Sequence, residues 1–192
     1  MHKFPKIYYF INEFNREEIQ NLNKNIALIY RNYHNKCDIN QIKKIRDFSN
    51  AQKRKFFISN NIKIAKKLNL DGIYIPSFNK LCNFKNLNVK KNFLILGSAH
   101  NLPELKNKEN QGCKAIFLAP LFKTNKSKFY LNPIKFNLLA NLSKINIVAL
   151  GGINPFNFSK LNLTRCDAFA SISWIKKNRP KKLGRFYNNL SY

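Results

Sequence analysis

The chain has 192 residues, a length typical of one domain, and 44% of its residues are hydrophobic, including 17 phenylalanines. This much apolar surface excludes a disordered chain, because its burial offsets the conformational entropy lost on folding. No stretch approaches the roughly 20 apolar residues that cross a bilayer, and Glu13 stands where a signal peptide would stay apolar. We therefore expect a soluble, cytoplasmic protein with no membrane partner.

The formal net charge of +26 raises the question of nucleic-acid binding. Only seven of the 35 basic residues are arginine, whose guanidinium reads base edges best, and the lysines are spread along the whole chain. The chain is equally rich in Asn, Ile, Phe and Tyr, which AT-rich codons favour. We therefore predict a solvated basic surface. Attraction of phosphorylated small molecules by part of this charge, and nucleic-acid binding, are kept as alternatives.

The four cysteines are far apart in the sequence. They form no C-x-x-C pair and have no histidine cluster nearby, as a zinc site would require. We expect them to be core thiols of a cytoplasmic protein. They are Cys37, Cys82, Cys113 and Cys166.

Eight short runs rich in β-branched and aromatic residues recur along the chain, each followed by a polar stretch with helix-like apolar spacing. Most runs are continuously apolar, which is typical of parallel strands buried on both faces. The pattern therefore predicts repeated βα units. The expected strands are 7–12, 26–32, 55–60, 72–77, 92–99, 115–120, 145–152 and 168–174.

Capping residues between these strands indicate where helices begin. Asn15 or Asn12, Asp38 and Asn101 each precede a helix-like segment, and their side-chain oxygens suit the free N–H groups of a first turn. Gly112 is expected to end the helix that begins after Asn101, because glycine readily adopts the left-handed conformation found there.

Two further helices are predicted from apolar spacing, at 61–69 and 133–142. Residues that recur every three or four positions are expected to share one apolar face. In the first helix these are Ile62, Ile64, Ala65 and Leu68, and in the second they are Ile134, Leu138 and Leu142. The connection at 81–91 is poorly periodic and is expected to be a loop or a single turn.

Eight strands alternating with about seven helices predict an α/β fold, a single compact (β/α)8 TIM barrel. An open doubly wound sheet is the competing fold. The barrel is favoured because no glycine-rich turn follows the first strand, where a nucleotide-binding sheet normally has one. We expect the barrel to occupy residues 1–178, and residues 179–192 to form a basic C-terminal tail.

In such a barrel the chemistry lies at the carboxyl ends of the strands. Gly151 and Gly152 precede a helix expected to begin near Asn154, and a glycine pair in that place lets backbone N–H groups approach a phosphate. A simple tight turn explains the pair equally well on its own. Because the loops after strands seven and eight often form a phosphate site together, phosphate binding is the favoured interpretation.

Three segments carry a family resemblance: ILGSAHNLPELKNKENQGCKAIFLAPLFKT, IVALGGINPFNF and CDAFASISW. They contain, in this order, the strand end Gly97-Ser98-Ala99-His100, the loop APLFKT at 119–124, a G-G-I loop and a strand that ends in serine. Through this order and spacing, residues 26–175 resemble thiamine phosphate synthase and its relative, the thiazole tautomerase. The resemblance implies the same barrel and an enzyme of thiamine biosynthesis.

The resemblance also implies roles for particular residues. It places Thr124 at a threonine that contacts substrate, and Ser98 near the pyrophosphate. Arg31 and Asn60 match an arginine and an asparagine at the ends of the second and third strands. Backbone groups that would bind the phosphate of the thiazole substrate lie at Gly151, Gly152, Ile172 and Ser173.

Several positions depart from the family pattern. A glutamine and a lysine of the synthase are replaced by Ile29 and Tyr33, and Ala119 replaces a loop glycine. The two aspartates that hold magnesium are replaced by Asn61 and Asn79. Because Mg²⁺ sites depend on carboxylates, we predict no metal ligands at these positions, although the synthase reaction implies Mg²⁺ as cofactor.

His100 stands where the tautomerase has its proton-transfer residue, and imidazole suits acid–base catalysis near neutral pH. As a lone histidine it is more often a helix-capping or core group. His2 and His34 are predicted to have no catalytic role. The family's synthases also carry a histidine at the position of His100, so this residue does not separate the two activities.

The predicted function is the coupling of 4-methyl-5-(2-hydroxyethyl)thiazole phosphate with hydroxymethylpyrimidine diphosphate to give thiamine phosphate and pyrophosphate, a transferase reaction. The alternatives are a metal-independent thiazole tautomerase, which is an isomerase, and an inactive barrel that binds a phosphorylated ligand. The expected partner is a phosphorylated small molecule, with no specific nucleic acid, and homo-oligomer formation is left open.

Overall fold

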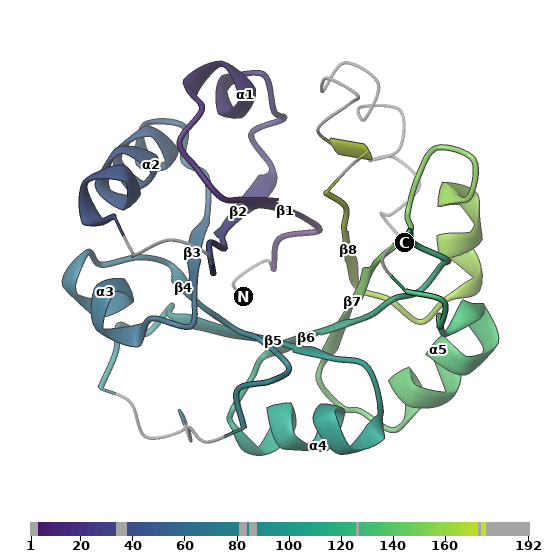
Figure 1. The fold of residues 1–192 in the computed structure, drawn as a ribbon. Helices are drawn as coiled ribbons and strands as arrows, with labels where there is room; N and C mark the ends of the chain where they lie inside the picture. The colour runs from purple at the N-terminus through teal and green to yellow at the C-terminus, as the bar shows by residue number, and fades with distance from the viewer. Residues whose placement is uncertain are drawn as a thin grey trace.

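The computed structural model describes residues 4–33, 38–80, 84, 88–125, 127–172, 174 and 175. Eight parallel strands pair in sequence order, and β1 pairs with β8, so the sheet is a closed barrel with helices outside it (Figure 1). The predicted fold is confirmed, and the open sheet is wrong, because Ile7 and Tyr8 of the first strand align with Phe169 and Ala170 of the last. The expected tail at 179–192 lies outside the described residues.

All eight predicted strands exist, but most are shorter than expected. Seven of the eight predictions run one to four residues past the observed carboxyl end, because they include the first residues of the following loop. Asn60, Gly151 and Gly152, for example, have positive φ angles that a strand does not adopt. The predicted strand 168–174 shows this most clearly, since it stops at Ala170. The strands are β1 (Ile7–Ile11), β2 (Ile26–Tyr30), β3 (Phe56–Ser59), β4 (Gly72–Ile75), β5 (Leu94–Ala99), β6 (Ala115–Leu118), β7 (Asn146–Leu150) and β8 (Ala168–Ala170).

Five α-helices and one 3-10 helix lie among the described residues, fewer than the seven helices expected. They are α1 (Arg16–Gln20), α2 (Ile39–Ala51), α3 (Ile62–Lys67), α4 (Leu102–Asn110), α5 (Asn132–Asn141) and the 3-10 helix η1 (Phe158–Leu163). Asn15, Asp38 and Asn101 cap α1, α2 and α4 as predicted, and Gly112 follows α4 with a positive φ. Each helix in this part of the chain is too short or too polar to span a bilayer.

The predicted inner face of α5 is wrong. Ile134 is 73% exposed, and Leu138 and Leu142 are also exposed, whereas Phe136 and Ala140 are buried against the barrel. The helix is apolar on several sides, so apolar spacing alone could not identify the face that packs on the sheet. The predicted inner face of α3 is confirmed, because Ala65 is buried and Ile62 and Ile64 pack against the core.

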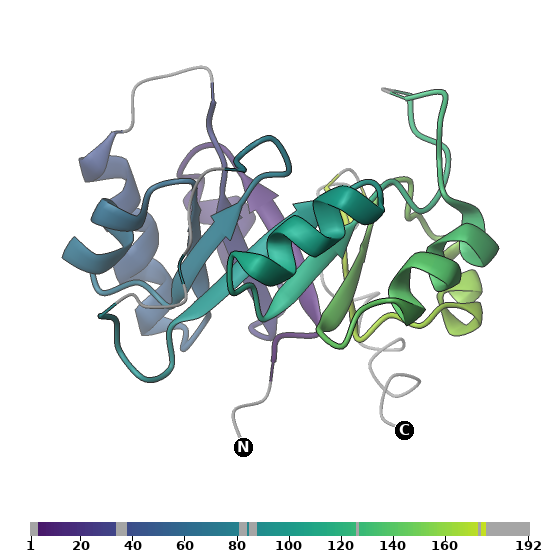
Figure 2. The same cartoon turned by 90° about the horizontal axis from the view of Figure 1, so that it is seen from below.

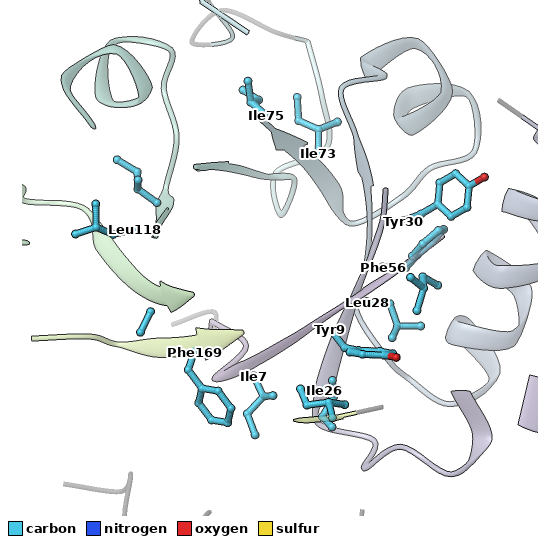
Figure 3. Packing of buried hydrophobic residues seen from close by; sticks show 14 of the residues in the cluster. Ile7, Tyr9, Ile26, Leu28, Tyr30, Phe56, Ile73, Ile75, Leu118 and Phe169 are labelled. Atoms are coloured by element: carbon cyan, nitrogen blue, oxygen red, sulfur yellow. The ribbon is translucent and has the colours of Figure 1, made fainter. Parts of the chain in front are cut away.

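Two apolar layers fill the fold. The outer layer lies between the strands and the helices, and Figure 3 shows Tyr9, Leu28 and Phe56 among the strand residues that point outward from the barrel. The inner layer fills the barrel itself, where large aromatic side chains pack against one another and small residues complete the layer. Its aromatic members are Tyr8, Phe10, Phe57, Tyr74 and Phe117, and its alanines are Ala27, Ala115, Ala168 and Ala170. This complementary packing leaves the barrel filled below its mouth.

Two of the four cysteines, Cys113 and Cys166, lie among the described residues, and both pack in or against the core as predicted. Burial raises the pKa of the Cys113 thiol to about 12, and burial also raises the pKa of Cys166. Both cysteines are free, and both are therefore expected to be unreactive. Cys37 and Cys82 lie outside the described residues.

Inside the barrel, the hydroxyl of Tyr8 is buried without a hydrogen-bond partner among the described residues. Its ring packs 5.0 Å from that of Phe117. Tyr8→Phe removes an unsatisfied polar atom and keeps the ring, so we expect it to raise the free energy of unfolding by about 1 kcal/mol. Tyr74→Phe is the matched control in the same layer. It is expected to lower that free energy by a similar amount, because the Tyr74 hydroxyl is hydrogen-bonded. Urea unfolding of both variants tests this, and a loss of stability in Tyr8→Phe would contradict it.

Candidate active site at the carboxyl ends of the strands

The parallel strands bring their carboxyl ends to one end of the barrel, which we call the mouth. The loop that joins β6 to α5 rises above this end of the strands (Figure 2). The residues predicted for the site lie near the carboxyl end of a strand or in the loop that follows it. The described ones are Arg31, Asn60, Ser98, His100, Thr124, Gly151, Gly152 and Ile172. Ser173 lies outside the described residues.

Arg31 directly follows β2, and its backbone N–H donates to the carbonyl of Ile11 over 2.8 Å. Its guanidinium lies 4.4 Å from the centre of the Phe10 ring and 6.0 Å from that of Tyr33. An aromatic face attracts a cation electrostatically, so the two rings stabilise this position of the guanidinium. The packing therefore holds a positive charge at the top of the barrel core.

Ser98 is buried in β5 and is hydrogen-bonded to Tyr74, which also interacts with Arg31. Burial raises the pKa of Tyr74 to about 12, although the Ser98 hydrogen bond and the Arg31 charge oppose the rise. Tyr74 is therefore a neutral hydroxyl beneath the mouth at physiological pH. The sequence analysis missed Tyr74; the alternation of inward and outward residues along β4 could have placed it inside the barrel.

The loops after β3 and β4 are joined by side-chain amides. Asn60 has a positive φ of 57°, its N–H donates to the carbonyl of Tyr74, and its side-chain oxygen accepts a hydrogen bond from the amide of Asn79. The side-chain oxygen of Asn61 accepts the N–H of Ile64 over 3.0 Å and so caps α3. These asparagines were predicted to lie at the candidate site, and Asn60 and Asn79 are in contact.

An aromatic pair that the sequence analysis did not identify lies at the rim of the mouth. The rings of Tyr33 and Phe78 are 5.6 Å apart in an edge-to-face arrangement, and both side chains are exposed. The Tyr33 hydroxyl lies 3.1 Å from that of Ser59. The pair therefore connects the loops after β2 and β4 across the end of β3.

Gly151 and Gly152 follow β7 and both have positive φ angles, 96° and 72°. An added Cβ on Gly151 would lie 2.7 Å from Pro120, and one on Gly152 would lie 2.6 Å from the carbonyl oxygens of Phe122 and Lys123. Glycine is required at both positions, because its backbone adopts these angles without strain and leaves room for the loop after β6. The pair thus packs closely against that loop.

The helix expected to begin near Asn154 is instead η1, a short 3-10 helix that begins at Phe158. The reason is a local hydrogen-bonded turn: the side chains of Asn154 and Asn157 bond to each other's backbone N–H groups. Both amides also donate to the carbonyl of Gly152. A phosphate at this loop would therefore depend on the glycine backbone rather than on a helix dipole.

The end of β8 is tied to the same loop. Ser171 is buried, and its hydroxyl donates to the carbonyl of Ile153 over 3.1 Å. Ile172 follows it and is partly exposed. The loops after β7 and β8 are therefore held together, as a shared phosphate site requires.

His100 lies at the exposed start of α4. Its Nδ1 and its backbone N–H both contact one carboxylate oxygen of Glu104, at 2.9 and 2.8 Å, while Asn101 accepts the N–H of Glu104. These contacts form a helix cap. The proton-transfer role of His100 stays a prediction. Thr124 pairs with Ser127 as an isolated β-bridge in the loop after β6.

A closed barrel of eight parallel strands, with helices outside it and the guanidinium of Arg31 at a polar mouth, defines a protein of the (β/α)8 barrel class. A sequence model described as thiamine monophosphate synthase matches residues 18–175. The chain therefore belongs to the thiamine monophosphate synthase family. The matched part begins in α1 and includes β2 to β8.

Individual relatives agree with the family. A thiamine-phosphate synthase of Methanococcus maripaludis is 31% identical over 126 residues, which are 64% of this chain and 59% of that protein. One of Pelagibacter ubique is 29% identical over 73% of this chain and 69% of that protein. Among solved structures, a thiamine phosphate pyrophosphorylase of Pyrococcus furiosus has a TM-score of 0.73 at 17% identity and covers 98% of both chains, so it supports the fold.

The family resemblance implies Mg²⁺, but the side chains at the mouth do not fit it. No group of three or more His, Cys, Asp or Glu residues that could hold a metal exists within the described ranges. The oxygen of Asn61 is already used to cap α3, and the amide of Asn79 is bonded to Asn60. A hard divalent cation prefers carboxylate oxygens, and neither position supplies one.

Proposed function

We propose that this protein is a thiamine-phosphate synthase that couples 4-methyl-5-(2-hydroxyethyl)thiazole phosphate with hydroxymethylpyrimidine diphosphate. The observation that carries the proposal is the family match over residues 18–175, which spans seven of the strands that bear mouth residues. The relatives whose names are given above are thiamine-phosphate synthases, which favours coupling over tautomerisation.

The reaction balances without a proton transfer. The bond between the pyrimidine methylene carbon and the diphosphate oxygen breaks, and its electron pair leaves with the diphosphate. The methylene carbon develops positive charge, and the lone pair of the thiazole nitrogen forms the new C–N bond. The protein must therefore bind two anionic substrates, hold the reacting atoms in line and stabilise the charge on the leaving group.

Arg31 suits the leaving group. Its guanidinium is fixed above Phe10 near the top of the barrel core, and a planar guanidinium binds phosphate oxygens through two parallel N–H groups. The amides of Asn60 and Asn79 and the hydroxyl of Tyr33 lie on the neighbouring loops and carry further donors. We assign this side of the mouth, formed by the loops after β2, β3 and β4, to the diphosphate.

The loops after β7 and β8 suit the phosphate of the thiazole. Gly151 and Gly152 are partly exposed and carry no side chain over their backbone, and Ser171 ties the end of β8 to the same loop. Thr124 belongs to the loop that packs on the glycine pair. The two anions would thus bind at opposite sides of one mouth, with the thiazole ring and the pyrimidine between them.

Turnover with both substrates tests the proposal. We expect thiamine phosphate and diphosphate to appear in equal amounts, as measured by chromatography and a coupled diphosphate assay. Incubation with a thiazole carboxylate phosphate is the parallel arm. Isomerisation of that compound without any coupling would show a tautomerase instead, and binding of thiazole phosphate without turnover would show an inactive barrel.

A further inference from the structure

On the side of the mouth assigned to the diphosphate, this chain lacks one positive and two negative side chains of the family pattern. Relative to the family pattern, Tyr33 replaces a lysine, and Asn61 and Asn79 replace the two aspartates that hold magnesium. The structure shows what stands there instead: Tyr33 contacts Phe78 and Ser59, and Asn79 contacts Asn60. The loops after β2, β3 and β4 are thus connected by neutral side chains.

A buried cation lies directly behind this network. Lys108 of α4 is completely buried, and its ammonium donates to the backbone carbonyl of Asn79 over 2.7 Å and to the side chain of Gln111 over 2.9 Å. The amide of Gln111 donates to the same Asn79 carbonyl over 2.9 Å. The carbonyl of Asn79 therefore already serves two donors, one of them charged.

This arrangement opposes a divalent cation and favours an anion. A positive charge in a poorly solvated place raises the electrostatic potential of the Asn79 loop, because few waters screen it. Arg31 adds a second positive charge on the side of β2. No carboxylate occupies positions 61 or 79 to reverse the sign, and the nearby amide and phenol groups can donate hydrogen bonds to phosphate oxygens.

We propose that this mouth binds diphosphate without a divalent cation, with Arg31 as the contacting cation and Lys108 as a buried positioning residue that holds the Asn79 loop. The proposal rests on the proposed function, since it assigns the leaving group to this side of the mouth. It adds one point to that function: the side chains of this protein stabilise the negative charge of the diphosphate without a metal ion.

Calorimetric titration with inorganic diphosphate at physiological ionic strength tests the proposal. In EDTA we expect binding of one diphosphate per chain, and Mg²⁺ in place of EDTA should tighten it by less than about threefold. Arg31→Met should weaken binding by about tenfold or more, because it removes a charge-assisted hydrogen bond. Arg165→Met is the matched control. It removes the same charge from the exposed surface beside α5, and it should leave binding unchanged.

Binding seen only with Mg²⁺ would overturn the proposal, and so would weak binding at several sites that Arg31→Met does not affect. Thiazole phosphate is titrated separately, because its site lies on the other side of the mouth. If coupling occurs but requires Mg²⁺, the metal-free inference fails and the synthase function stands. If neither ligand binds and no coupling occurs, both fail. Circular dichroism melting of Arg31→Met and Arg31→Lys separates loss of the site from loss of the fold.

Discussion

Gly152→Ala is expected to lower kcat/KM for coupling by at least about 100-fold, because displacement of a positioned site by about 1 Å costs this much. The added Cβ would lie 2.6 Å from the carbonyl oxygens of Phe122 and Lys123, and the φ of 72° is one that alanine rarely adopts. The glycine loop and the loop after β6 would have to separate. We expect the loss mainly as a higher KM for thiazole phosphate, measured by initial rates at fixed pyrimidine diphosphate.

The control for this change is Gly112→Ala. Gly112 also has a positive φ, 87°, but it follows α4 at the opposite end of the barrel. Both variants place alanine at a positive φ, and only Gly152→Ala should lose thiazole phosphate binding. Equal losses of activity in the two variants would mean that the glycine pair serves the fold and does not bind substrate.

The largest effect on stability is expected for Arg54→Met. Arg54 is 2% exposed, and its guanidinium donates to the carbonyls of Ile19, Leu22, Asn23 and Ile26 and to the side chain of Gln52. These bonds tie the segment between α1 and β2 to the start of β3. Methionine fills similar space but leaves several carbonyls unsatisfied, so we expect the free energy of unfolding to fall by about 3–5 kcal/mol.

Guanidinium chloride unfolding measures this loss, and Arg46→Met is its control. Arg46 is paired with Asp47 on the exposed surface of α2, where an ion pair contributes less than about 1 kcal/mol. Diphosphate binding should persist in folded Arg54→Met, because Arg54 lies at the amino end of the barrel, away from the mouth. If Arg54→Met lowered the free energy of unfolding by less than Arg46→Met does, Arg54 would not have the structural role assigned to it.

The fold was predictable because the signal for a strand in this chain is local. Parallel strands buried on both faces appear as short apolar runs, and each of the eight runs became a strand. The face of α5 was not predictable in the same way. Ile134 and Phe136 are both apolar, and which of them is buried depends on how the helix lies on its neighbours.

The positions of the candidate residues at the strand ends were predictable, but the contacts between their side chains were not. The order of motifs placed Arg31, Asn60 and Gly152 at one mouth, because parallel strands share a carboxyl end. Tyr74 and Lys108 were missed because their roles arise from contacts between segments far apart in sequence. Lys108 looks like one more surface lysine in a chain with 35 basic residues. Its position three residues after the buried Leu105 is the signal that it faces the barrel.

A crystal structure grown with thiamine phosphate and diphosphate in the presence of EDTA shows whether one mouth holds two anions at opposite sides. We expect the phosphate of thiamine phosphate at the backbone of Gly151 and Gly152, and the diphosphate at Arg31 and the Asn79 loop, with no metal between them. Both anions on one side of the mouth, or the ligands bound away from the carboxyl ends of the strands, would contradict it.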